Sequence, residues 1–191
     1  MTPFLGSAST HILSGLGGLD GRALKKGDVL RTGPAHGSFR RQTVAPAALE
    51  VLAPRKILRV TKGPQSDWFS DATRAAFYDC TYRVTEESNR MGLRLEGTPV
   101  DGQVSGHMIS EGVSLGAIQV PAGGQPIILF VEQQTAGGYP KVANIITADL
   151  PSVGQLRPRD EIRFELVDLE TAWSLLRRQE EILASKELIL E

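Results

Sequence analysis

The pattern of apolar and polar positions along this chain predicts many short strands and few helices. Apolar residues alternate with polar ones, or run on briefly, between boundaries of glycine, proline and polar clusters. The expected strands are 29–32, 57–61, 81–84, 93–95, 116–120, 127–131, 145–147 and 162–166. Because 127–131 is a continuous apolar run, we expect that strand to be buried on both faces.

Two stretches have a helical pattern. A short helix near 66–78 is expected to begin at Ser66 or Ser70, since both are good N-caps. Its inward-facing residues are expected to be Trp68, Ala72, Ala75 and Ala76. A longer C-terminal helix follows the N-cap Asp168, with apolar residues at helical spacing: Leu169, Trp173, Leu176 and Leu183. Trp173 is expected to be a core or docking residue of this helix.

The strand pattern is weak before residue 54. Residues 33–53 are predicted to form a long connection, and 11–21 a glycine-rich loop. The chain is therefore expected to divide into a loop-rich N-terminal segment, 1–53, and a barrel domain with a C-terminal helix, 54–191.

Composition narrows the class of protein. The 191 residues are 41% hydrophobic with a net charge of −1, and the basic residues are scattered, which argues against a nucleic-acid partner. The chain lacks an apolar run of about 20 residues, so we expect no membrane span. Cys80 is the single cysteine, which excludes an internal disulfide and fits a cytoplasmic location. The three histidines stand far apart, so no metal site is predicted.

Four polar clusters each end or leave a predicted strand: 61–65, 88–92, 110–112 and 132–140. The last of these brings a carboxylate, two amides and a hydroxyl into a glycine-opened loop. Such a loop presents chemistry on a rigid scaffold, but each cluster taken alone is also consistent with an ordinary solvated turn.

The order of five motifs resembles one known family. They are Lys-Gly-Pro-Gln (62–65), Ser-Asn-Arg-Met-Gly (88–92), Glu-Gly-Val (111–113), Gly-Ala-Ile-Gln-Val-Pro (116–121) and Gln-Thr-Ala-Gly-Gly-Tyr-Pro (134–140). The family is the biotin-dependent carboxyltransferases, also called allophanate hydrolase subunit 2 or the C subunit of 5-oxoprolinase. The chain resembles the C-terminal part of the family pattern, because the family's Gly-Ser-x-Ser-Thr motif stands at 6–10. Residues 1–53 are then expected to be the remnant of a longer N-terminal region.

The resemblance implies a mainly β fold, a closed antiparallel barrel of cyclophilin-like type. It also implies a subunit of an ATP-dependent 5-oxoprolinase. The alternatives are a carboxyltransferase component of a urea carboxylase or allophanate system, or a non-enzymatic module that antagonises a kinase-inhibitor partner. No cofactor is expected on this chain alone, since ATP or carboxybiotin would come with partner subunits. The expected partners are a second carboxyltransferase-like subunit, a biotin carrier in the alternative, and further copies of this chain, which is expected to be inactive in isolation.

The family reactions involve an amide, which needs a carboxylate to steer its N–H and donors to hold its oxygen. On this resemblance, Glu132, where many relatives have Asp, takes the first role, and Lys62 and Arg90 are the other catalytic candidates. The substrate-binding candidates are Gln65, Ser88, Asn89, Glu111, Gln119, Gln134, Thr135, Gly137, Gly138 and Tyr139. We expect Glu132, Gln134, Arg90 and Lys62 to line one concave surface.

Overall fold

The fold is that of a computed structural model, which describes residues 1–34, 42–102 and 108–190. The chain divides into two units, Met1–Arg41 and Gln42–Glu191. The predicted boundary lay twelve residues later, after residue 53. The difference arises because residues 42–53 form a short strand and a helix that belong to the second unit.

The first unit has little regular structure. Strands β1 (Thr10–His11) and β2 (Leu16–Gly17) form an antiparallel pair around the 3-10 turn η1 (Ile12–Ser14). None of residues 1–34 is buried. Residues 29–32, predicted as a strand, have no strand structure, because no neighbouring segment pairs with them. Turns and local polar contacts hold this unit in place of an apolar core.

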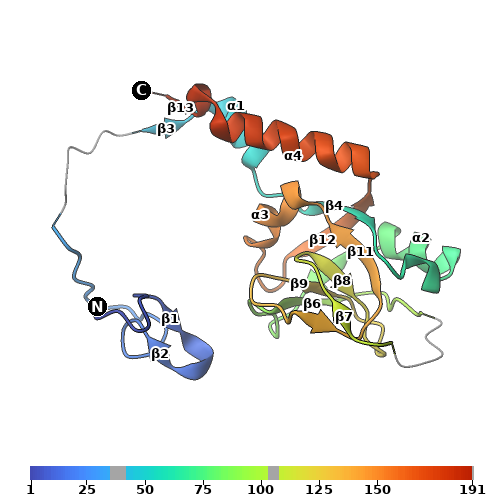
Figure 1. Ribbon diagram of the computed structural model, residues 1–191, viewed down its shortest axis with the longest axis horizontal. Coiled ribbons are helices and arrows are strands. Elements are labelled where there is room, and N and C mark those ends of the chain that lie inside the picture. Colours follow the sequence, from blue (N-terminus) through green and yellow to red (C-terminus); the bar gives the residue numbers. More distant parts are fainter. Residues whose placement is uncertain (35–41, 103–107, 191) are drawn as a thin grey trace. The chain divides into compact units, whose positions relative to one another are not determined.

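The centre of the second unit is a closed barrel of seven strands (Figure 1). They are β4 (Ile57–Lys62), β5 (Tyr82–Val84), β6 (Gly92–Glu96), β8 (Ala117–Gln119), β9 (Ile127–Leu129), β11 (Lys141–Ile145) and β12 (Glu161–Leu166). Their order around the barrel is β11-β4-β12-β5-β6-β9-β8. The prediction of a closed, mainly β barrel is confirmed. Its neighbours are antiparallel except β4 and β12, which run parallel, so the barrel is mixed.

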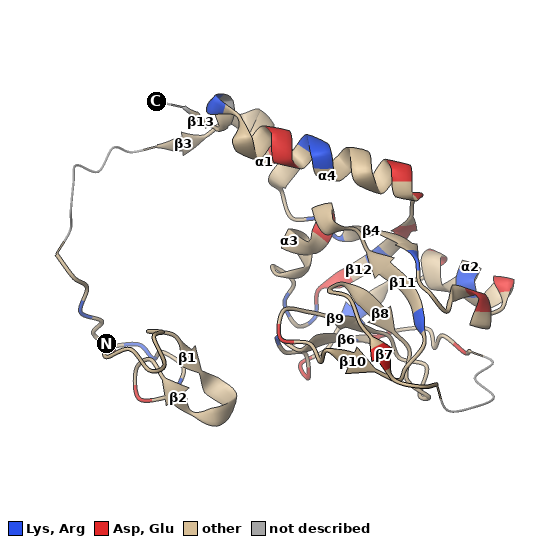
Figure 2. Cartoon of the chain, in the orientation of Figure 1, with Lys and Arg blue, Asp and Glu red and all other residues tan. Residues whose placement is uncertain are grey.

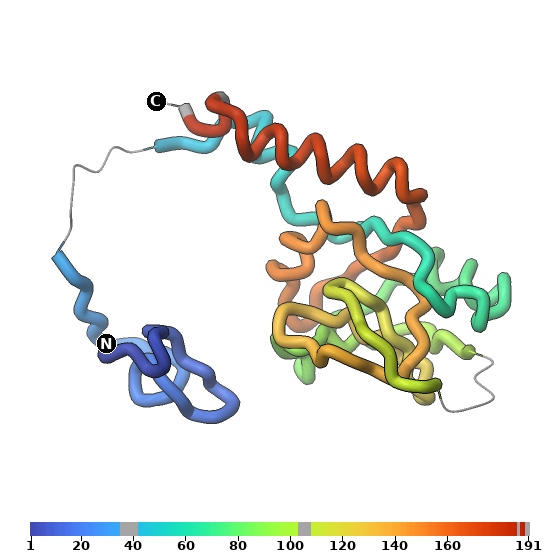
Figure 3. Tube along the Cα trace, viewed as in Figure 1, coloured from blue at the N-terminus to red at the C-terminus, as the bar shows by residue number. Residues whose placement is uncertain are grey.

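Short elements surround the barrel. The helices are α1 (Pro46–Leu52), α2 (Asp71–Asp79), α3 (Leu150–Val153) and α4 (Leu169–Ala184). The 3-10 turns are η2 (Ser66–Trp68), η3 (Thr147–Asp149) and η4 (Lys186–Leu188). The two-residue strands are β3 (Thr43–Val44), β7 (Glu111–Gly112), β10 (Ala136–Gly137) and β13 (Ile189–Leu190). Strand β13 pairs with β3, so the chain's C-terminal end lies beside the start of the second unit (Figure 3).

The barrel interior is the core of the protein. Its fully buried side chains include Leu58, Val60, Tyr82, Ile118, Ile128, Val142, Ile145 and Ile162. They come from six different strands of the barrel, so burial of apolar surface and closure of the sheet are the same event.

The observed limits of two strands differ from the predicted ones. They differ where a polar residue is buried or an apolar one is exposed. Strand β9 ends at Leu129, and the half-exposed Val131 lies beyond it. Strand β11 begins at Lys141, four residues before the predicted start, and residue 147 already belongs to η3. The predicted connection 33–53 contains β3 and α1.

Helix α2 has its predicted cap but a different buried face. Ser70 Oγ accepts a hydrogen bond from the backbone N–H of Thr73 at 3.1 Å, whereas Ser66 begins the separate turn η2. The buried residue of the helix is Phe77, whose ring stacks on Phe164 with centroids 4.8 Å apart. The inward residues predicted for this helix were wrong for three of the four, because Trp68, Ala72 and Ala75 are exposed.

Helix α4 also begins as predicted, with Asp168 Oδ1 accepting from the backbone N–H of Thr171 at 2.7 Å. Its inner face packs Ala172, Leu175 and Leu176 against the cluster formed with η3. Trp173 is 70% exposed and lies on the outer face, so it is not a core residue. Among the described residues, no helix combines the length and apolar character needed to cross a membrane.

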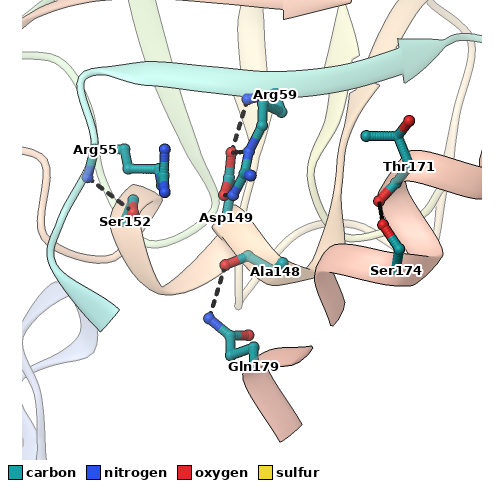
Figure 4. A network of polar contacts seen from close by, with 8 residues as sticks. All are labelled: Arg55, Arg59, Ala148, Asp149, Ser152, Thr171, Ser174 and Gln179. Carbon is teal, nitrogen blue, oxygen red and sulfur yellow. Dashed lines mark hydrogen bonds and ion pairs between the residues drawn. The ribbon is translucent and has the colours of Figure 1, made fainter. Parts of the chain in front are cut away.

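A buried ion pair fastens β4 to η3 (Figure 4). The carboxylate of Asp149 is 1% exposed and accepts hydrogen bonds from the Arg59 backbone N–H at 2.8 Å, from its Nε at 3.0 Å and from its Nη2. Nearby, Ser152 Oγ accepts from the Arg55 N–H at 3.0 Å, and Gln179 Nε2 donates to the Ala148 carbonyl at 3.1 Å. These bonds join β4, η3, α3 and α4.

Asp149→Asn removes the charge that neutralises Arg59 while nearly keeping the shape. Breaking one side of a buried pair leaves an uncompensated charge, so we expect the free energy of unfolding to fall by about 3 kcal/mol. Denaturant unfolding measures this change. The control Asp160→Asn breaks the more exposed Lys56–Asp160 pair, at 2.6 Å, and is expected to cost at most about 1 kcal/mol. Equal losses of stability in the two variants would contradict the view that burial makes the Arg59–Asp149 pair more important to the fold.

Candidate functional site

Closure of the barrel brings three of the sequence motifs together: 62–65, 116–121 and 134–140, the last of which leads into β11. Strand β11 lies between β4 and β8, with Ala143 opposite Lys62 and Lys141 opposite Gln119. Beyond the end of β4, the backbone N–H of Gly63 donates to the Val142 carbonyl at 3.0 Å. A Cβ on Gly63 would lie 2.2 Å from the Lys141 carbonyl oxygen, so only glycine permits this approach.

A buried ammonium group lies at this junction. The Lys141 side chain is 3% exposed, and its Nζ lies 2.5 Å from Glu111 Oε1. The same carboxylate oxygen accepts from Gln65 Nε2 at 2.8 Å, and Gln65 Oε1 accepts from the Lys141 backbone N–H at 3.1 Å. The hydrogen bonds from Lys141, and secondarily from Gln65, hold the pKa of Glu111 below its usual value. Glu111 therefore stays ionised at neutral pH and neutralises the buried lysine.

An unpaired donor lies next to this cluster. Gln119 is 1% exposed, and its Oε1 accepts from Gln134 Nε2 at 3.4 Å. Its Nε2 makes no hydrogen bond to any described residue. A Cβ on Gly137 would lie 2.5 Å from this Nε2, and Gly137 pairs with Glu111 across β7 and β10. Glycine at 137 therefore keeps the backbone close to a buried amide that still has a hydrogen bond to give.

Arg90 and Glu132 form a second group. Arg90 Nε lies 2.6 Å from Glu132 Oε1, and the Glu132 backbone N–H donates to the Arg90 carbonyl at 2.9 Å. Lys62 is exposed at the end of β4, and Gln134 belongs to the first group. Arg90 and Glu132 thus lie together, while the placement of all four residues on one concave surface stays a prediction.

Ser88 and Asn89 are engaged in the turn that carries Arg90. Ser88 Oγ accepts from the Arg94 N–H at 3.0 Å and donates to the Arg94 carbonyl at 3.3 Å. Asn89 Oδ1 accepts from the N–H groups of Met91 at 2.8 Å and Gly92 at 3.3 Å. The described bonds of both side chains are therefore structural and fix the position of Arg90.

The remaining predicted residues follow Gln134 along the chain. The Thr135 carbonyl accepts from the Val113 N–H at 3.1 Å and so continues the pairing of β7 with β10. Gly138 and Tyr139 line a cavity of about 390 Å³. Its other walls include Phe69, Val100, Asp101, Val120 and Pro140. Tyr139 is thus a wall residue of this cavity.

Lys141 was missed by the sequence analysis. The available signal was its position directly after the 134–140 motif and before the stretch 142–146, which is apolar except for Asn144. Side-chain alternation could not assign Lys141 to a buried face, because the pairing of β11 with β8 shifts register between Lys141 and Ala143.

The arrangement is suited to hydrogen bonding with a polar ligand. The first group combines a buried amide donor, a buried lysine paired with Glu111 and glycine backbone. The second group adds the carboxylate of Glu132 and the guanidinium of Arg90. Within the described residues no three His, Cys, Asp or Glu side chains gather as metal ligands. The donors and carboxylates of these two groups can bind a polar ligand and hold or move its protons.

Fold and site together define a barrel domain with a polar cluster gathered by strand closure. Comparison with known proteins gives the particular family. The model of the carboxyltransferase domain, subdomain A and B, matches residues 1–166, and the chain belongs to this family.

Individual relatives agree with this assignment. The chain is 35% identical over 176 residues to the C subunit of 5-oxoprolinase from Haemophilus influenzae, a match covering 92% of this chain and 55% of that protein. It is 36% identical over 170 residues to the Escherichia coli protein of the same name, covering 89% and 54%. The chain thus spans about half the length of these curated relatives.

A solved structure gives the same result for the fold. The urea amidolyase of K. lactis superposes on 99% of this chain, and on 13% of that protein, with a TM-score of 0.72 at 28% identity. The barrel and its surrounding helices are therefore an arrangement already known from a solved urea amidolyase structure.

The pKa of Glu111 yields a prediction about acid stability. Because this pKa is lower in the folded chain than its ordinary value of 4.5, the carboxylate contributes stability above that pH. The contribution is lost as the pH falls through the folded-state pKa. We expect Glu111→Gln to be less stable than the wild type at neutral pH, with a gap that narrows as the pH falls below 4.5.

Urea unfolding at a series of pH values measures this gap. The control is Glu161→Gln, because Glu161 is exposed and makes no side-chain hydrogen bond to a described residue. Its curve should run parallel to that of the wild type. A gap for Glu111→Gln that stays constant with pH would mean that ionisation of Glu111 does not stabilise the fold.

Proposed function

We propose that this chain acts as one subunit of an ATP-dependent 5-oxoprolinase, together with a second carboxyltransferase-like subunit in the cytoplasm. The observation that carries the proposal is the similarity, at 35% and 36% identity, to the C subunits of two 5-oxoprolinases along most of this chain. The gathered polar cluster at Lys141 supports it, because opening a lactam requires groups that bind an amide.

The reaction converts 5-oxoproline, ATP and two waters into glutamate, ADP and phosphate. The lactam oxygen gains charge as its ring opens, so it needs hydrogen-bond donors, and the ring nitrogen must receive a proton. Gln119 Nε2 supplies an unused donor, and Lys62, Gln134 and the backbone N–H groups of Gly137 and Gly138 remain donor candidates. Glu132 handles the nitrogen proton, with Arg90 keeping its carboxylate in place.

A carboxyltransferase of the urea carboxylase type is the second candidate, favoured by the fold likeness to K. lactis urea amidolyase. In that case a partner biotin carrier would bring carboxybiotin, and urea would be the acceptor. The same carboxylate and donors would then serve a different amide. Neither ATP nor carboxybiotin is proposed to bind this chain without partner subunits.

The deciding experiment is co-purification of this chain with the product of a neighbouring carboxyltransferase-like gene, followed by assays of the complex. Glutamate and phosphate released from 5-oxoproline with ATP support the oxoprolinase. Carboxybiotin breakdown that depends on urea supports the alternative. A stable complex with neither activity, acting only on a regulatory kinase inhibitor, would identify a binding module.

In the complete complex, Glu132→Gln is expected to lower turnover about a hundredfold or more, since it removes a positioned acid–base group. Folding should be unaffected, because the Arg90–Glu132 pair is largely exposed on the Arg90 side. Turnover at matched protein concentration measures the loss, with Glu161→Gln as the control. Wild-type turnover in Glu132→Gln would exclude this residue from the mechanism.

The isolated chain is expected to be inactive and to associate with copies of itself. The first unit exposes large apolar side chains, among them Leu5, Ile12, Leu13, Leu24 and Val29. Exposed apolar surface of this extent is typical of a surface that another polypeptide covers. Light scattering and a turnover assay on the purified chain test both points, and an active monomer would contradict them.

A further inference from the structure

A cavity of about 280 Å³ lies where helices α1 and α4 meet the barrel, away from the polar cluster at Lys141. Its walls are Ala47, Glu50, Val51, Arg55, Arg59, Ala148, Leu175, Arg178 and Gln179. They come from α1, the segment leading into β4, strand β4 itself, η3 and α4. All of these elements belong to the second unit, so the cavity is part of one folded body.

Three arginines are among the residues that line this cavity. Arg59 uses its Nε and Nη2 on Asp149, which leaves Nη1 outside these bonds. Arg55 donates its backbone N–H to Ser152, and its guanidinium makes no described hydrogen bond or ion pair. The Arg178 guanidinium likewise has no partner among the described residues. In Figure 4, Arg55 and Arg59 both extend toward the η3–α3 segment.

The charges around the cavity do not cancel. Asp149 is saturated by Arg59, and Glu50 is the one carboxylate among the described residues of the wall. The chain as a whole has a net charge of −1, and Figure 2 shows positive and negative residues interspersed over its elements. Arg55 and Arg178 thus bring two positive charges against the single carboxylate of Glu50, and this local excess of positive charge favours an anion in the cavity.

We propose that this cavity binds a small oxyanion of the phosphate class. Guanidinium groups present paired N–H donors that match the oxygens of phosphate, and bonds between charged partners are roughly twice as strong as neutral ones. Arg55 and Arg178 supply the free donors, and the bound Asp149 keeps Arg59 fixed beside them. This site does not depend on the proposed function, because none of its residues belongs to the polar cluster at Lys141.

The bound anion would connect parts that are distant in the sequence. Arg178 lies on α4, and Arg55 lies two residues before β4. A ligand held by both draws the C-terminal helix toward the barrel and the end of α1. Since such a ligand binds the folded chain and not the unfolded one, it raises the unfolding temperature as its concentration rises.

The test uses inorganic phosphate as the probe and the whole chain as the protein. Isothermal titration and thermal unfolding are run against sodium chloride at equal ionic strength. The double variant Arg55→Gln, Arg178→Gln removes the free donors, and circular dichroism checks its fold. The matched control, Arg83→Gln with Arg177→Gln, removes the same charge elsewhere, since neither of these arginines lines the cavity.

We expect saturable binding at one site by the wild type and the control, with at least about tenfold weaker binding by the double variant. The unfolding temperature should rise with phosphate in the first two proteins only. Should the double variant fail to fold, Arg178→Gln alone carries the test, because its side chain is exposed. No saturable binding, or equal binding by wild type and cavity variants, would overturn the proposal.

Discussion

The pairing of strand β11 with both β4 and β8 is the constraint on which the rest of the protein depends. Without it the barrel would be an open sheet with two unpaired edges. The pairing tolerates no side chain at Gly63, because a Cβ there would lie 2.2 Å from the Lys141 carbonyl oxygen. The motifs at 62–65, 116–121 and 134–140 adjoin these same strands, so closure hides the edges and gathers these three motifs in one step. Site formation is therefore a consequence of barrel formation.

The buried lysine at this closure is better explained by function than by stability. Replacing a buried ion pair with apolar residues of similar volume is often neutral or stabilising, so Lys141 and Glu111 are a costly way to fill the end of a barrel. The pair is also asymmetric, since Lys141 is 3% exposed and the Glu111 side chain 45%. A fixed ammonium behind a reachable carboxylate is an arrangement suited to steering a polar ligand.

Local patterns predicted local structure well. The strands at 57–61, 93–95 and 162–166 and the Asp168 cap follow from side-chain alternation and capping chemistry. What failed depends on distant partners: residues 29–32 have strand composition but no pairing neighbour, and Lys141 reads as a loop residue until Glu111 is placed beside it. The motif order marked a set of residues as site candidates. It could not indicate that Ser88 and Asn89 serve a turn, because that use appears only in their hydrogen bonds.

The two units of the chain are stabilised by different kinds of interaction. The second unit buries apolar side chains from every strand of its barrel. Residues 1–34 bury none, and a segment of that size is too small to build its own core. Its firmest contact is local: Asp28 accepts from both terminal nitrogens of Arg22, at 2.8 and 2.9 Å, and from the Lys25 N–H, which lowers the Asp28 pKa to about 2. Local polar bonds can hold such a turn in shape, but they leave its apolar residues in water. The first unit is thus held in shape by local polar bonds, whereas the barrel is held by its apolar core.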